Sequence, residues 1–335
     1  MTPPVNREGR HIATGIAIAL LCLTTNVESG ERPNILLIVA DDLGWGDVSY
    51  PQLRARGNRY EGSEVVKTPN LERMAQAGIR LCRFYAASPV CSPTRASLLT
   101  GRHGRRHRID GPLFLESEGK LRNRELTIAE LAQACGYQTG HFGKWHVGSL
   151  TKHVYDMRRG RVGNYLHHSA PWHNGYGTVF ACENWMPTFA PYAGFPTNKA
   201  AQAAYFTGRS TPDLSGRVSG SDPRVGQRHE SEIVADAAAR FIEKSAKNAD
   251  SFFATVWFST PHVPLAETPI TDFDHLGLSD ERRRYCEAIA AMDAQIGRLR
   301  ELLRELGAAD DTLILFTSDN GPNDLNVGST VGLRG

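Results

Sequence analysis

The stretch Asn34-Ile35-Leu36-Leu37-Ile38-Val39-Ala40 is a nearly continuous apolar run of strand length, and the pair Asp41-Asp42 follows it directly. A run without polar alternation predicts a strand that is buried on both faces. Residues 252–259 have the same character and are predicted to be another buried strand, and residues 312–317 are predicted to be the last strand. Together these runs indicate a largely parallel sheet whose two faces are covered by helices.

Helical periodicity appears between the predicted strands, and Thr127 with Glu130 forms a capping box at the start of one helix. Because strands and helices alternate, an α/β fold is expected. Residues 150–228 lack clear periodicity, and we expect them to form long loops over one face of the sheet. Helices are predicted over residues 70–78, 127–137, 230–246 and about 280–306.

The composition is that of an ordinary soluble globular protein. The chain has 335 residues, of which 41% are hydrophobic and 22% are charged, and its formal net charge is +2. This net charge favours no nucleic-acid partner. One local exception is the basic run Arg102-His103-Gly104-Arg105-Arg106-His107-Arg108, which is either a solvated loop or a surface that attracts an anionic substrate.

The amino terminus has the pattern of an export signal. Arg7 and Arg10 precede an apolar run over 12–23, and small residues near Ser29 suit cleavage. We therefore predict a signal peptide over 1–30 and a secreted or periplasmic protein with no membrane span after cleavage, the alternative being an uncleaved tail. The six cysteines match no zinc or disulfide framework.

Polar side chains follow each predicted strand at the point where the strand ends. Because ligands bind outside the carboxyl ends of strands in open α/β sheets, we expect these side chains to converge. The residues concerned are Asp41, Asp42, Lys144, His146, His262, Asp319 and Asn320.

Four of these residues predict a metal site. Adjacent carboxylates such as Asp41 and Asp42 repel each other unless a cation lies between them. Together with Asp319 and Asn320 they offer only oxygen ligands, which favour Ca²⁺ or Mg²⁺ over zinc. For Asp41-Asp42 taken alone, a turn at the end of a strand is the simpler interpretation.

A second group predicts anion binding and proton transfer. If a helix begins near Pro93, Cys91 lies near its positive end, and Arg95 lies one turn further on. Lys144 can hold an anionic oxygen, and in an extended segment it faces the same side as His146. Both His146 and His262 suit proton transfer near neutrality. A buried structural cysteine with an exposed arginine is the alternative interpretation of Cys91 and Arg95.

The run 84–102, which contains Cys91-Ser92-Pro93-Thr94-Arg95, closely resembles the sulfatase signature of the alkaline-phosphatase superfamily. The resemblance extends over 33–335 and is also strong at 41–47, 140–146 and 318–321. It implies an α/β/α sandwich with a large, mostly parallel mixed sheet. It also implies that 31–335 is an incomplete catalytic domain, because the family's smaller carboxy-terminal domain and a further sulfate-binding lysine are expected beyond residue 335.

The resemblance also implies a role for each site residue. Cys91 would be oxidised to formylglycine by a formylglycine-generating or equivalent maturing enzyme, and one hydroxyl of the aldehyde hydrate would attack sulfur. Arg95 would stabilise the hydrate, Lys144 and His262 would bind the sulfate and the leaving oxygen, and His146 would assist breakdown of the intermediate. The expected metal is Ca²⁺ rather than Mg²⁺, held by Asp41, Asp42, Asp319, Asn320 and residue 91.

The expected activity is therefore hydrolysis of an aryl or carbohydrate sulfate ester, with a sulfated small molecule or glycan as substrate. One alternative is a phosphonate or phosphodiester hydrolase of the same superfamily. Another is a catalytically defective, truncated paralogue that only binds sulfated ligands.

Overall fold

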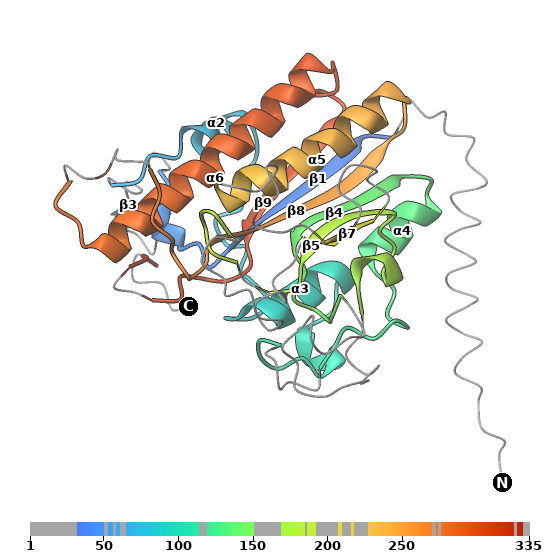
Figure 1. Cartoon of the computed structure of the whole chain (residues 1–335), viewed down its shortest axis with the longest axis horizontal. Helices are drawn as coiled ribbons and strands as arrows, with labels where there is room; N and C mark the ends of the chain where they lie inside the picture. The colour runs from blue at the N-terminus through green and yellow to red at the C-terminus, as the bar shows by residue number, and fades with distance from the viewer. Residues whose placement is uncertain are drawn as a thin grey trace, which may run out of the picture.

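A seven-stranded sheet forms the centre of the computed structural model, and helices cover both of its faces (Figure 1). The predicted leader and much of the region 150–228 lie outside the described residues. The structure describes residues 32–49, 53–55, 58–60, 65–113, 119–150, 169–184, 186–191, 207–209, 216–217, 227–269, 273, 276–324 and 327–330. None of the helices described in these ranges is long and apolar enough to span a membrane.

The strand order of the sheet is β7-β6-β5-β4-β8-β1-β9, and the five strands from β5 to β9 in this order are parallel. Two short antiparallel strands, β6 and β7, extend one edge. The strands are β1 (Asn34–Asp41), β4 (Gln138–Lys144), β5 (Thr178–Cys182), β6 (Thr207–Arg209), β7 (Gly216–Arg217), β8 (Phe252–Pro261) and β9 (Thr312–Ser318). A separate two-stranded sheet pairs β2 (Leu53–Ala55) with β3 (Asn58–Tyr60).

The register of the parallel strands aligns their carboxyl ends. Asp41 of β1 pairs with Pro261 of β8, and Ala40 pairs with Ser318 of β9. The backbone N–H of Asp319 also donates to the Ala40 carbonyl at 3.0 Å. The polar residues that follow these strands therefore emerge at one edge of the sheet.

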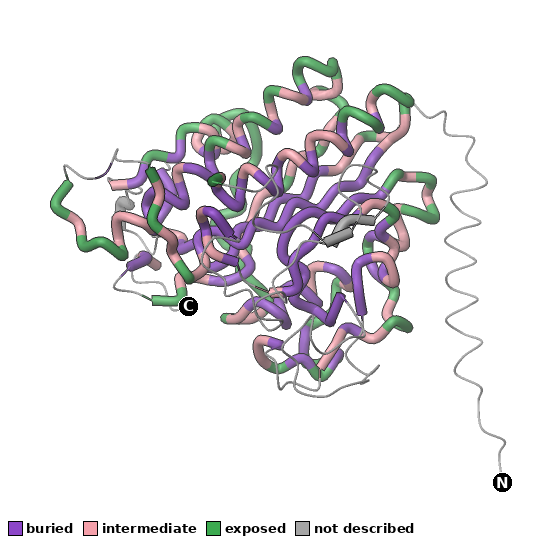
Figure 2. The backbone as a smooth tube through the Cα atoms, in the orientation of Figure 1, coloured by how far each residue is buried: buried purple, intermediate pink, exposed green. Residues whose placement is uncertain are grey.

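Two hydrophobic cores lie on the two faces of the sheet. Leu36 and Ile38 of β1 belong to the first core and Leu37 and Val39 to the second, as the alternation of side chains along a strand requires. Figure 2 shows the central strands β1, β4 and β8 buried between the two layers. The edge strand β9 is the exception, because Leu313 and Leu315 are 50% and 44% exposed. The first core is covered by α2 (Pro69–Ala77), α5 (Glu230–Lys247) and α6 (Asp280–Glu305), and the second by α3 (Cys91–Thr100) and α4 (Ile128–Ala134).

The predicted α/β/α architecture and mostly parallel sheet are confirmed. The predicted capping box is present, because Thr127 Oγ1 accepts from the Glu130 N–H at 3.1 Å and Glu130 Oε2 accepts from the Thr127 N–H at 2.8 Å. The expectation of loops alone over 150–228 was wrong at β5, β6 and β7, which are strands of the central sheet too short to show a clear sequence period. Asn70 lies inside the first turn of α2 and is not the cap, which is Thr68.

The amino terminus of α2 is held by a carboxylate from α6. Asp293 accepts hydrogen bonds from the backbone N–H of Asn70 at 3.0 Å and of Leu71 at 2.8 Å, and from the Asn70 side-chain amide at 2.8 Å. The first N–H groups of a helix have no intrahelical partner, and a negative charge near this end interacts favourably with the helix dipole. Asp293 therefore fixes the packing of α2 on α6.

We expect Asp293→Ala to lower the free energy of unfolding by about 2–3 kcal/mol, because it leaves buried N–H groups without acceptors. Urea denaturation measures this change. Glu305→Ala, which removes an exposed acid from the same helix, is the matched control and should change stability by less than about 0.5 kcal/mol. Equal effects of the two substitutions would contradict the capping role.

The carboxyl end of β8 is held by Glu230, the first residue of α5. This side chain is completely buried, and its carboxylate accepts from the Ser259 N–H at 3.1 Å and from Thr260 Oγ1 at 3.2 Å. Burial raises the pKa of Glu230 to about 7. Glu230 thereby fixes the segment that leads into His262.

This pKa predicts a pH-dependent stability. Unfolded Glu230 ionises near its ordinary pKa of 4.5, whereas the folded protein retains the proton up to about pH 7. The folded state binds more protons in this window, so stability should fall by up to about 3 kcal/mol as the pH rises through it. Glu230→Gln should flatten the curve of unfolding free energy against pH, and the half-exposed neighbour Glu232→Gln should not. Parallel curves for wild type and Glu230→Gln would rule out this linkage.

Candidate active site

Three carboxylates meet at the carboxyl edge of the sheet. Asp41 ends β1, Asp42 follows it with a left-handed φ of 62°, and Asp319 follows β9. The Asp42 N–H donates to Asp319 Oδ1 at 3.3 Å, which joins the ends of these two strands. Asp41 and Asp319 are completely buried. One ligand atom from each of these three residues and from Cys91 lies within 4.8 Å of all the others.

Cys91 lies beside these carboxylates as the first residue of α3. Its Sγ is 3.4 Å from Asp41 Oδ1 and 4.0 Å from Asp42 Oδ1. The helix begins at Cys91 itself, two residues before the expected start near Pro93. Burial, and then the Asp41 carboxylate, raise the pKa of the Cys91 thiol far above its usual range. The thiol is therefore protonated at neutral pH, and an unmodified Cys91 is a poor nucleophile.

Two buried cations neutralise part of this negative charge. Lys144 Nζ lies 2.6 Å from Asp41 Oδ2 and 3.6 Å from the Cys91 Sγ. Arg95 Nη2 lies 3.2 Å from Asp41 Oδ1 and 2.8 Å from Asp319 Oδ2. Burial opposes ionisation of Asp41, but attraction to Lys144 and Arg95 outweighs it and holds the Asp41 pKa well below its ordinary value. Arg95 is thus a buried partner of the carboxylates and not an exposed residue.

The cluster fits a cation with oxygen ligands. Burial, and then Asp41, raise the pKa of Asp319 to about 8, and the same causes raise the pKa of Asp42. A cation between the carboxylates would relieve this penalty. The Asn320 amide nitrogen donates to Asp42 Oδ1, while its buried Oδ1 has no hydrogen-bond partner among the described residues. An unpartnered buried amide oxygen beside three carboxylates suits a hard divalent ion.

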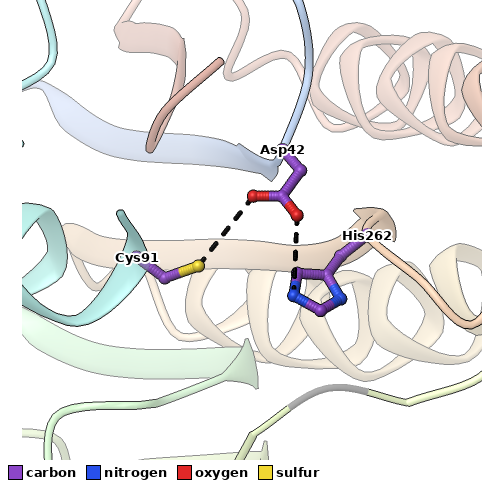
Figure 3. A group of neighbouring side chains, drawn as sticks. All are labelled: Asp42, Cys91 and His262. Atoms are coloured by element: carbon purple, nitrogen blue, oxygen red, sulfur yellow. Dashed lines mark hydrogen bonds and ion pairs between the residues drawn. The ribbon is translucent and has the colours of Figure 1, made fainter. Parts of the chain in front are cut away.

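His262 lies at the more open side of the cluster. It follows the end of β8, its Nε2 is 3.5 Å from Asp42 Oδ2, and its side chain is 17% exposed. Figure 3 shows Asp42 between Cys91 and His262, with interactions to both. One ligand atom from each of Asp42, Cys91 and His262 lies within 4.8 Å of the other two, so His262 borders the same site as the cysteine.

His146 is placed differently from the expectation. β4 ends at Lys144, and His146 has a left-handed φ of 56°, so the extended path assumed between these two residues is interrupted. The His146 side chain is buried, and its backbone N–H donates to the Glu183 carbonyl at 2.8 Å. The prediction that His146 faces the same side as Lys144 assumed an extended segment, and the segment is not extended at His146.

Trp257 and Glu230 support the site without having been singled out in the sequence. The Arg95 guanidinium lies over the Trp257 ring at 5.1 Å from its centroid, and Arg95 Nη1 donates to the Lys144 carbonyl at 3.1 Å. Trp257 belongs to an apolar run and Glu230 to an ordinary acidic first turn of a helix. No local signal separates such residues from structural ones.

Comparison with known proteins identifies the family of this chain. A sequence model of the family described as Sulfatase matches residues 33–328. Arylsulfatase G of Rattus norvegicus is 31% identical over 88% of this chain and 53% of its own length, and N-acetylgalactosamine-6-sulfatase of Homo sapiens is 31% identical over 87% and 50%. The chain thus spans about half the length of these relatives.

A solved structure of Ps i-CgsB in complex with k-i-k-neocarrahexaose superposes with a TM-score of 0.70 and 25% identity. The match covers 91% of this chain and 62% of that protein. Because the family model covers most of the sequence and the solved structure shares the fold, this chain belongs to the sulfatase family.

Proposed function

We propose that this chain carries the catalytic domain of an enzyme that hydrolyses sulfate esters, with formylglycine formed from Cys91 as the nucleophilic residue. The observation that carries the proposal is the position of Cys91, at the start of α3 and within 4 Å of both Asp41 and Asp42. The high pKa of its thiol supports conversion to another nucleophile, and a formylglycine-generating or equivalent enzyme is the partner that this requires.

The proposed metal is Ca²⁺, and its ligands are Asp41, Asp42, Asp319, Asn320 and residue 91. When all three carboxylates are ionised, as ligation of a cation requires, they exceed the two buried cations Lys144 and Arg95 by one negative charge, which by itself would repel a sulfate ester. A bound divalent ion would supply the positive charge that reverses this sign and polarises the sulfate oxygens.

The side chains around Cys91 have distinct proposed roles. The hydrate of formylglycine would supply both the attacking hydroxyl and a second hydroxyl through which sulfate is released. Lys144, 3.6 Å from the Cys91 Sγ, holds an anionic sulfate oxygen, and Arg95 holds the carboxylates that orient residue 91. Partly exposed His262 gives a proton to the leaving oxygen, and His146 remains a candidate for the breakdown step.

The proposed substrate is an aryl or carbohydrate sulfate. Support comes from the names of two relatives, arylsulfatase G and N-acetylgalactosamine-6-sulfatase, and from the carbohydrate bound by Ps i-CgsB. A sulfated small molecule or glycan therefore suits the site better than an uncharged ester.

Ca²⁺ is expected to stabilise the wild-type chain and not the Asp42→Asn variant. At a concentration 100 times its dissociation constant, a bound ion adds about 2.7 kcal/mol to the free energy of unfolding. Without metal, Asp42→Asn should be as stable as wild type or more so, because it removes a carboxylate whose pKa is raised by burial and by Asp41. Thermal melts with and without Ca²⁺, and with Mg²⁺, measure both effects. An equal response to Ca²⁺ in both proteins would exclude Asp42 as a ligand.

Cys91→Ser should lower kcat on an aryl sulfate by about 10³-fold or more, because serine offers no second hydroxyl for releasing sulfate. The chain is co-produced with a maturing enzyme, and mass spectrometry verifies formylglycine at residue 91. Cys82→Ser, at an exposed cysteine, is the matched control and should retain full activity.

An aryl phosphonate assayed in parallel separates the alternatives. Faster cleavage of the phosphonate than of the sulfate would replace the proposal with a phosphonate hydrolase. Binding of a sulfated ligand without turnover, despite verified formylglycine, would identify a binding protein.

A further inference from the structure

The basic run 102–108 is an exposed surface that the proposed reaction does not use. The side chain of Arg102 is 55% exposed and that of Arg105 is 83% exposed, and Arg106 and Arg108 are also exposed. Four arginines within seven residues repel one another. Such a concentration of charge in a protein with a net charge of only +2 calls for a physical explanation.

The shape of this segment does not depend on the four arginine side chains. η3 (Gly104–His107) is built around His107, which is buried and whose Nε2 is hydrogen-bonded to Thr100 Oγ1 at 2.8 Å. His103 Nδ1 accepts from the Arg105 N–H, and the Arg108 N–H closes the turn on the Arg105 carbonyl at 3.1 Å. The arginine side chains are therefore presented to solvent by a scaffold that other groups hold in place.

The segment is attached at both ends to the residues that follow Cys91. Gly104 lies so close to Pro93 that a Cβ at this glycine would be 2.5 Å from the Pro93 Cβ. Further along, the Leu113 N–H donates to Ser92 Oγ at 2.9 Å. Residues 104–113 thus form a loop anchored on the first turn of α3, on the face of the sheet that α3 and α4 cover (Figure 1).

The positive charge of the basic run 102–108 is only weakly compensated by nearby acidic side chains. Arg102 lies 3.3 Å from Glu125, and Arg105 lies 3.9 Å from the exposed Asp110, a distance at which a solvated pair contributes little. Arg106 and Arg108 form no ion pair within the described part of the chain.

We propose that the basic loop 104–113 is a second anion-binding site, which holds a further sulfate group of a polysulfated oligosaccharide whose reacting ester lies at residue 91. The inference rests on the proposed function, because an oligosaccharide with several sulfates supplies anions to both sites at once. Guanidinium groups bind sulfate oxygens in paired hydrogen bonds, and Arg105, Arg106 and Arg108 present such groups beside the nucleophile helix. The loop would thereby select polysulfated chains over monosulfated compounds.

The test measures binding of a heparin-derived hexasaccharide by calorimetry. The parent protein carries Cys91→Ala, which prevents turnover, and it is compared with a variant that also carries Arg106→Gln/Arg108→Gln. We expect the double variant to bind about tenfold more weakly, and its plot of log affinity against log salt to have a slope smaller by about 2. Arg298→Gln/Arg304→Gln, which removes the same charge from exposed positions on α6, is the control and should bind like the parent.

Several outcomes would overturn the proposal. These are no hexasaccharide binding by the parent protein, equal losses in the test and control variants, or an equal loss of affinity for a single-stranded DNA of similar charge. The KM for a monosulfated aryl ester, measured with Cys91 intact and matured, should be the same in wild type and in Arg106→Gln/Arg108→Gln. Since binding is measured without turnover, failure of the loop proposal can be told apart from failure of the proposed hydrolysis.

Discussion

The buried carboxylate of Asp41, held between Lys144 and Arg95, is the interaction on which the rest of the site depends. Asp41 ends β1, Lys144 ends β4 and Arg95 comes from α3, so three elements must pack correctly before the charges can pair. Removing one partner from a buried ion pair costs about 3–5 kcal/mol, because the other charge is left without compensation. The site is therefore also part of what specifies the packing of α3 and β4 against β1.

The same cluster combines strong attraction with unrelieved repulsion. Asp41 is fully compensated by its two cations, whereas Asp42 and Asp319 are carboxylates whose pKa values burial and Asp41 raise. This asymmetry suits a centre that receives a divalent ion on one side and an anionic substrate on the other. The buried Asn320 oxygen, which has no hydrogen-bond partner among the described residues, fits the same interpretation.

Around this centre, two further segments are held in place by different kinds of contact. Glu230 ties the end of β8 to α5 just before His262. The loop 104–113 is tied to Ser92 by a hydrogen bond and to Pro93 by close packing, and its Ile109 and Leu113 side chains lie in the second core. Rigid support of this kind keeps the side chains near residue 91 in place, while the arginines of the loop remain exposed to a ligand.

The sequence by itself determined the buried parallel strands β1 and β8, the capping box at Thr127 and the convergence of polar residues at one edge, because these follow from local periodicity and from the direction of parallel strands. Only the tertiary structure decided that Arg95 is buried against Asp319, 224 residues away, and that the backbone leaves the extended conformation at His146. Glu230 likewise gained its role from a strand end that lies 29 residues further along the chain. Contacts of this kind depend on how distant elements pack, and neither propensity nor spacing along the chain encodes them.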